Sequence, residues 1–176
     1  MVNIYEIKEW SSGTTYNKFD IVFYNYLDTK YFWYSMVNGS TTSAPTISNP
    51  QWGGAKFSQE LGKVKPNFIW KPSYNFSVAS NPTSQVLKFG DGYEQRTLTD
   101  IHPDLVKATV SFEGRTNNEA KAIAHFFAAR KGTESFIFKL PPPYAVEKLF
   151  VSRNWNYSMK FFDNNTISTT FEEVTI

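Results

Sequence analysis

Short runs of β-branched and aromatic residues, separated by turn-forming residues, fill the first third of the chain. Residues 20–26 and 30–37 are two such runs, and the segment Leu27-Asp28-Thr29 between them suits a hairpin turn. Residues 38–50 are rich in Gly, Ser, Thr, Asn and Pro, which predicts a long loop. The pattern therefore predicts a small N-terminal β module over residues 1–54, followed by a polar linker over residues 55–66.

From residue 67 onward the pattern predicts longer strands around one helix. Gly90-Asp91-Gly92 separates two β-prone runs and predicts a tight hairpin, because glycine tolerates positive φ. Thr116 and Glu119 have the spacing of a capping box, apolar residues follow at helical spacing, and Gly132 predicts the C-terminal cap. Further strands are predicted over residues 107–112, 135–140, 148–151, 157–162 and 168–174. Residues 67–176 are therefore predicted to be a second, mainly β domain with a single amphipathic helix.

Composition supports a folded β protein and narrows its chemistry. Aromatic residues make up 18% of the 176 residues, and such rings pack well on a pleated, half-buried face. The net charge of +2 gives no whole-chain support to a nucleic-acid binder of the basic-patch kind. The chain has no cysteine, which excludes disulfides and thiolate sites. The N-terminus has no signal-peptide pattern and no apolar run is long enough to span a bilayer, so we expect cytoplasmic folding without membrane insertion.

The reactive residue types form no recognisable catalytic or metal-binding pattern. The two histidines, His102 and His125, belong to no metal-ligand spacing, and we interpret both as structural or solvent-facing. Gly90-Asp91-Gly92 does not open a helix, so it is interpreted as a turn and not as a phosphate loop. The adjacent Glu172 and Glu173 should face opposite sides of a strand. We therefore expect no catalytic residues, no metal site and no cofactor.

The segment from Phe68 to Val174 resembles the minor tail protein M family of lambda-like long-tailed phages. The residues that carry the resemblance are Trp70-Lys-Pro-Ser-Tyr74, Val86-Leu-Lys-Phe-Gly-Asp-Gly-Tyr-Glu-Gln-Arg96, Val110-Ser-Phe112, Phe126-Phe127, Glu134-Ser-Phe136, Trp155 and Thr169-Thr-Phe171-Glu-Glu-Val174. The resemblance implies a β-sandwich or split barrel with a flanking helix, similar to the tail-tube fold.

This resemblance also implies a structural function in the virion. Such subunits form a ring, usually a hexamer, between the tail tube protein and the tip hub protein, with DNA passing through the lumen. The expected location is the tail tip, after assembly in the host cytoplasm. Because the Asp-Gly hairpin suits subunit pairing, we expect the ring interface to include Phe89, Gly90, Asp91, Gly92, Tyr93, Glu94 and Arg96.

The N-terminal segment resembles type-3 chitin-binding modules, the carbohydrate-binding family 5/12 class. The matching residues are Trp10, Tyr16, Asp20-Ile-Val22, Tyr24, Tyr31, Pro45 and Trp52, although the exposed Trp-Trp pair of many chitin binders is missing. Sugar binding requires exposed rings that stack on apolar C–H faces. The candidate stacking residues for a cell-surface glycan are Trp33, Tyr34, Trp10 and Trp52. Alternatively, these rings form the core of the small module.

The sequence therefore supports three alternative functional hypotheses. The first is a structural ring protein, and the second is a glycan-binding module that the virion displays for adhesion. The third is a cell-wall-degrading enzyme, which would need an acid–base pair that residues 66–176 do not offer.

Overall fold

The computed structural model describes residues 6–40, 43–74, 76–82, 84–98 and 104–175. Its strands are β1 Lys8–Glu9, β2 Thr15–Tyr16, β3 Ile21–Tyr26, β4 Thr29–Ser35, β5 Gly39–Ser40, β6 Trp52–Gly53, β7 Ala55–Ser58, β8 Lys63–Pro66, β9 Ser77–Ser80, β10 Ser84–Lys88, β11 Glu94–Leu98, β12 Val106–Arg115, β13 Phe136–Lys139, β14 Glu147–Phe161 and β15 Asn164–Glu173. The α-helix of the described residues is α1, Asn117–Arg130. The prediction of a mainly β fold with one flanking helix is confirmed.

The body of the protein is a five-stranded sheet in the order β13-β14-β15-β12-β9. Alternate side chains along β12 and β15 are buried, as expected for strands with one covered face. The predicted strands at 148–151 and 157–162 are one strand, β14, with an irregularity in its pairing between Ser152 and Trp155. Such an irregularity bends a strand without ending it, which explains why the sequence pattern is interrupted there.

Helix α1 begins with the N-cap that the sequence predicts, and its C-cap lies one residue before the predicted one. The Thr116 hydroxyl accepts a hydrogen bond from the backbone N–H of Glu119 at 3.3 Å. The carboxylate of Glu119 binds Arg115 at 2.9 Å. At the other end Lys131, one residue before the predicted Gly132, is the left-handed C-cap, and Gly132 also has positive φ.

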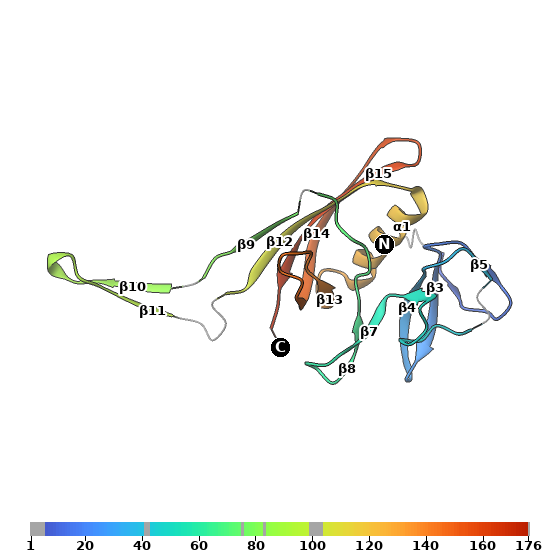
Figure 1. The fold of residues 1–176 in the computed structure, drawn as a ribbon, viewed down its shortest axis with the longest axis horizontal. Helices are drawn as coiled ribbons and strands as arrows, with labels where there is room; N and C mark the ends of the chain where they lie inside the picture. Colours follow the sequence, from blue (N-terminus) through green and yellow to red (C-terminus); the bar gives the residue numbers. More distant parts are fainter. Residues whose placement is uncertain (1–5, 41–42, 75, 83, 99–103, 176) are drawn as a thin grey trace.

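The helix is covered on two sides, which the amphipathic pattern alone did not predict. Phe127 packs toward the sheet, with ring centroids 5.8 Å from Trp155 and 5.9 Å from Phe171. On the other side His125 lies 4.8 Å, centroid to centroid, from Phe32 of strand β4. Figure 1 shows the N-terminal strands beside α1 and the sheet beyond it. The N-terminal module therefore shares one apolar core with the body, because Tyr34 belongs to the same buried cluster as Phe126.

The stretch predicted as a linker is a β-hairpin. Strands β7 and β8 pair antiparallel from Ala55 with Pro66 to Ser58 with Lys63. Their alternate positions carry Lys56, Lys63 and Lys65. These lysines give the segment a polar sequence, which is why it was predicted to be a linker. The N-terminal module itself is built on a sheet of order β1-β3-β4-β6, with a second small aromatic cluster around Trp33.

Candidate assembly interface

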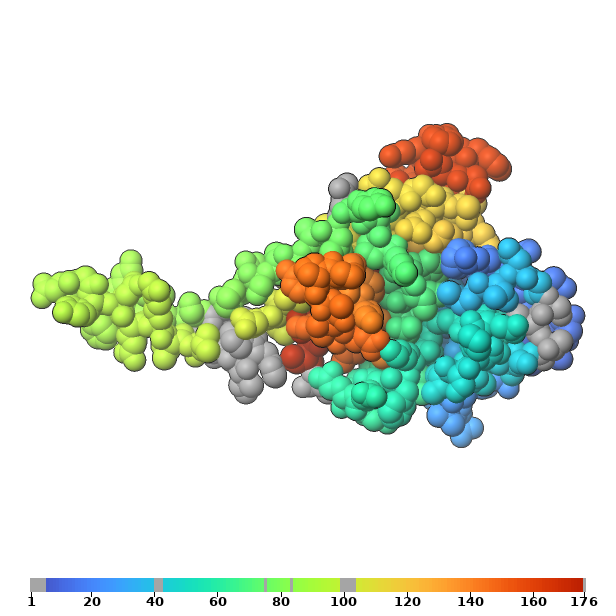
Figure 2. Space-filling model, in the orientation of Figure 1, coloured from blue at the N-terminus to red at the C-terminus, as the bar shows by residue number. Residues whose placement is uncertain are grey.

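Strands β10 and β11 form an arm that extends away from the body (Figures 1 and 2). All ten residues of the two strands are exposed. They pair with each other antiparallel, from Ser84 with Leu98 to Lys88 with Glu94, and with no other strand of the described residues. An isolated two-stranded hairpin is only marginally stable in water, so an arm of this kind gains stability when another surface covers it.

The tip of the arm carries the turn that the sequence predicts. Residues 90–92 form a short 3-10 turn in which Asp91 has φ 69° and Gly92 has φ 80°. The backbone N–H of Phe89 donates to the carbonyl of Tyr93 at 2.8 Å and closes the turn. Positive φ at two successive positions explains why Asp and Gly stand there.

Each face of the arm carries both polar and exposed apolar side chains. Directly paired residues share a face, so Leu87 lies on the same side as Phe89 and Tyr93, whose exposed fractions are 56% and 76%. The opposite face carries Lys88, an ion pair between Glu94 and Arg96, and the exposed apolar residues Val86 and Leu98. The arm therefore presents exposed apolar side chains on both faces, with Leu87, Phe89 and Tyr93 together near its tip, and such side chains are the kind that subunit contacts cover.

The structure brings all seven predicted interface residues together on this arm. Residues 89–93 form its tip, and Glu94 and Arg96 begin β11. Their role in subunit contact stays a prediction.

A second exposed apolar group lies at the end of the β14–β15 hairpin and was missed in the sequence. Tyr157, Met159, Phe161 and Phe162 are exposed there, and this end projects from the body in Figure 2. Strand β13 pairs only with residues 147–150 of β14, so among the described residues the outer edge of residues 151–161 has no paired strand. The alternation of Tyr157, Met159 and Phe161 was the signal that could have indicated an apolar strand face.

The predicted stacking residues Trp33 and Tyr34 are fully buried, so the glycan-stacking prediction is wrong for both. They point to opposite faces of β4, as alternation requires, but both faces are covered. Trp33 lies in the small aromatic cluster, and Tyr34 packs against α1. An aromatic ring stacks on a sugar only through an exposed face, and neither ring has one.

The other two stacking candidates also pack inside the N-terminal module. Trp52 is 5% exposed and lies 5.3 Å, centroid to centroid, from Tyr16. Trp10 is half-buried and meets Tyr24 edge-on at 5.5 Å. The alternative interpretation, that these rings form the core of a small fold, is the one that the contacts support.

His125 is buried and structural, as one of the two sequence interpretations expected. Its Nδ1 lies 3.1 Å from the Tyr34 hydroxyl. Burial first, and then the charges of Arg130 and Lys121, lower its pKa from 6.5 to about 4, so the ring is neutral at pH 7. His102 lies outside the described residues. Within the described parts of the chain, no group of three or more His, Cys, Asp and Glu residues could hold a metal ion, and no helix is long and apolar enough to cross a bilayer.

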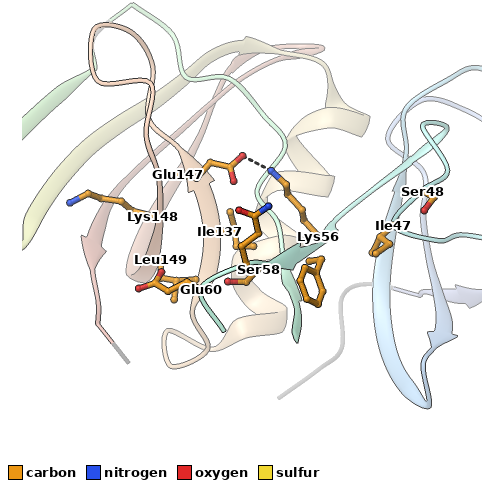
Figure 3. A pocket seen from close by; sticks show the side chains of 11 residues that line it. Ile47, Ser48, Lys56, Ser58, Glu60, Ile137, Glu147, Lys148 and Leu149 are labelled. Atoms are coloured by element: carbon orange, nitrogen blue, oxygen red, sulfur yellow. Dashed lines mark hydrogen bonds and ion pairs between the residues drawn. The ribbon is translucent and has the colours of Figure 1, made fainter. Parts of the chain in front are cut away.

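A groove of about 530 Å³ lies between the β7–β8 hairpin, the loop at Ile47 and strands β13 and β14 (Figure 3). Three of its charged groups, Lys56, Glu147 and Lys148, form ion pairs. Lys56 pairs with Glu147 across the groove, and Lys148 pairs with Glu173 at 2.7 Å. Phe57 adds an exposed apolar ring to the lining. This mixture of ion pairs and an exposed ring suits a contact surface.

Comparisons with known proteins cover the part of the chain that contains the arm and the five-stranded sheet. Residues 66–175 match the family model described as "Phage minor tail protein". A curated relative, the "Tail tip protein M" of Escherichia phage lambda, is 31% identical over 85 residues, which cover 48% of this chain and 75% of the relative. The family match does not include residues 1–65, and the comparisons do not support the resemblance of that segment to chitin-binding modules.

Proposed function

Because the chain belongs to the phage minor tail protein family, and is therefore a structural component of a phage tail, we propose that its copies form a ring at the tail tip. The ring, most simply a hexamer, joins the tail tube protein to the distal hub protein, and DNA passes through its lumen. The placement at the tip rests on the relative that is named for that position.

The observation that carries this proposal is the exposed arm. Folding leaves Leu87, Phe89 and Tyr93 in solvent on one face of an isolated hairpin. Exposed apolar side chains favour burial by about 25 cal/mol per Å² of apolar area, so contact with a neighbouring copy would stabilise the arm.

The position of the arm supports a ring more than a symmetric dimer. The arm and the exposed β14–β15 end are separate surfaces, and they extend from the body in different directions in Figure 1. Contacts between two different surfaces of identical subunits are heterologous, and such contacts close into rings when the rotation permits. In the proposed ring the arm of each copy packs on its neighbour.

The test compares arm variants with a matched surface control. Phe89→Ser with Tyr93→Ser removes the apolar tip of the arm, whereas Leu27→Ser with Tyr74→Ser removes two exposed apolar residues elsewhere. Light scattering over a concentration series measures assembly, and circular dichroism checks that each variant folds. We expect the wild type and the control to assemble, and the arm variant to require about ten-fold higher concentration or more, since losing two apolar anchors costs a few kcal/mol.

Two results would contradict the proposal. One is a wild-type protein that stays monomeric at every concentration and is absent from purified virions. The other is a folded arm variant that assembles as well as the control, which would leave the family assignment intact but remove the arm from the interface.

A further inference from the structure

A pocket of about 290 Å³ lies where the N-terminal module, the β7–β8 hairpin and the end of helix α1 meet. We call it the cationic pocket and define it by the charged residues that line it: Lys30 from β4, Lys63 and Lys65 from β8, and Arg130 and Glu134 from the end of α1 and the turn after it. The three elements come from distant parts of the sequence, so no local motif could indicate this pocket.

The cationic pocket has a larger excess of positive over negative charge than the chain as a whole has. Four cationic side chains and one carboxylate line it, whereas the whole chain carries a net charge of only +2. Among the described residues, no ion pair involves any of the four cations. Like charges gathered without counter-charges repel one another, and an anion between them removes that repulsion.

Arg130 is the most informative of the four because it is 6% exposed. Its guanidinium lies 3.5 Å over the ring of Phe126, and its NH1 donates to the carbonyl of Phe126 at 2.6 Å. Its side chain is also hydrogen-bonded to Tyr34, but its Nε–H is buried and has no hydrogen-bond acceptor among the described residues. A buried charge is costly unless it is paired, and a buried donor without an acceptor adds to that cost.

Two of the three lysines, Lys65 and Lys30, contact neighbouring groups, whereas Lys63 is exposed. Lys65 donates to the Ser135 hydroxyl at 3.2 Å, and the Lys30 ammonium lies 3.8 Å from the ring centroid of Phe23. The C-terminal end of α1 does favour cations, but a helix end supplies only about half a negative charge. Glu134 and the helix end together do not balance four cations.

We propose that the cationic pocket binds a phosphate group, with Arg130, Lys63 and Lys65 as its principal donors. Arg and Lys are the usual phosphate donors, and a dianionic group would offset most of the excess charge. A pocket of this volume holds one phosphate group and does not admit the side of a DNA duplex. The ligand is therefore a small phosphate ester or the phosphate of a flexible polymer. This site does not depend on ring formation, because one copy of the chain supplies all its residues.

The test is isothermal titration of the full chain with inorganic phosphate at constant ionic strength, with chloride as the background anion. The double variant Lys63→Gln with Lys65→Gln removes two donors from an exposed hairpin and should leave the fold unchanged. Lys160→Gln is the matched control, because Lys160 is exposed on β14 and lies away from the cationic pocket. We expect the wild type and Lys160→Gln to bind phosphate alike, and the double variant to bind about ten-fold more weakly or worse.

Two further titrations separate the sources of the phosphate. A poly(glycerol phosphate) chain that binds more tightly per phosphate than inorganic phosphate indicates a polymer ligand, and the reverse indicates a small ester. Either result supports the site. The proposal is overturned if wild-type protein takes up no phosphate. It is also overturned if a DNA duplex binds and Lys160→Gln weakens binding as much as the double variant, because attraction would then be spread over the surface. These measurements need no assembled ring, so they fail or succeed separately from the proposed function.

Discussion

At the scale of single residues, His125 is a polar side chain with a structural role in the packing between α1 and the N-terminal module. The ring stands between Phe32 and the helix core, and it meets the Tyr34 hydroxyl at 3.1 Å. Its position on the helix beside Phe126 was visible in the sequence, but its partner on β4 lies 91 positions away along the chain. Only the docking of the N-terminal module on α1 brings the two together.

The lowered pKa of His125 predicts that acid destabilises the protein. The folded-state pKa is about 4, below the ordinary value of 6.5, so the unfolded chain binds a proton that the folded chain does not. Stability should therefore fall as the pH drops from about 6.5 to about 4, by on the order of 3 kcal/mol from this residue. Thermal unfolding of the wild type and of His125→Gln across this range measures the difference.

The expected result is that His125→Gln loses stability at pH 7 but shows a smaller decrease toward pH 4. Carboxylates that protonate in the same range affect both proteins equally, so the difference between the two curves belongs to the histidine. Parallel curves for wild type and variant would show that His125 is not buried as a neutral ring.

At the scale of elements, local signals predicted what depends on neighbouring residues. The Thr116 cap and the Asp91-Gly92 turn stand where the sequence indicated, because each needs only a few adjacent residues. The β7–β8 hairpin was missed because its lysines and glycine give the segment a polar sequence. The burial of both Trp33 and Tyr34 depends on two different partners, a small aromatic cluster and α1, and strand alternation reveals neither.

We expect the arm to contribute to assembly but not to the thermal stability of the monomer. Ser80 and Val106 are paired neighbours in the sheet, so a short Asn-Gly turn can replace residues 81–105. Since β10 and β11 pair only with each other and are wholly exposed, we expect the Tm of the shortened monomer to stay within a few degrees of the wild type. Sedimentation should show that this protein no longer forms oligomers.

A large drop in Tm for the shortened monomer would mean that the arm stabilises the body. A shortened protein that still forms oligomers would place the subunit contacts elsewhere. The β14–β15 end would then be the first surface to examine, because Met159 and Phe161 are exposed there.

At the scale of the whole molecule, one aromatic core joins the part of the chain that matches the family model and the part outside that match. The family match begins at residue 66, whereas Tyr34 belongs to the same buried cluster as Phe126. The N-terminal module is therefore packed against a tail protein body and contributes Lys30 to the cationic pocket between them. The arm lies at the far end of the molecule from this module in Figure 1, so both surfaces can act at once.

Cryo-electron microscopy of the purified virion tail tests the central claim most directly. The account predicts a closed ring of this chain at the tail tip, with the exposed side chains of Leu87, Phe89 and Tyr93 on each arm against a neighbouring copy. A tail in which the chain is absent, or in which its arms extend into solvent without touching another copy, would contradict it.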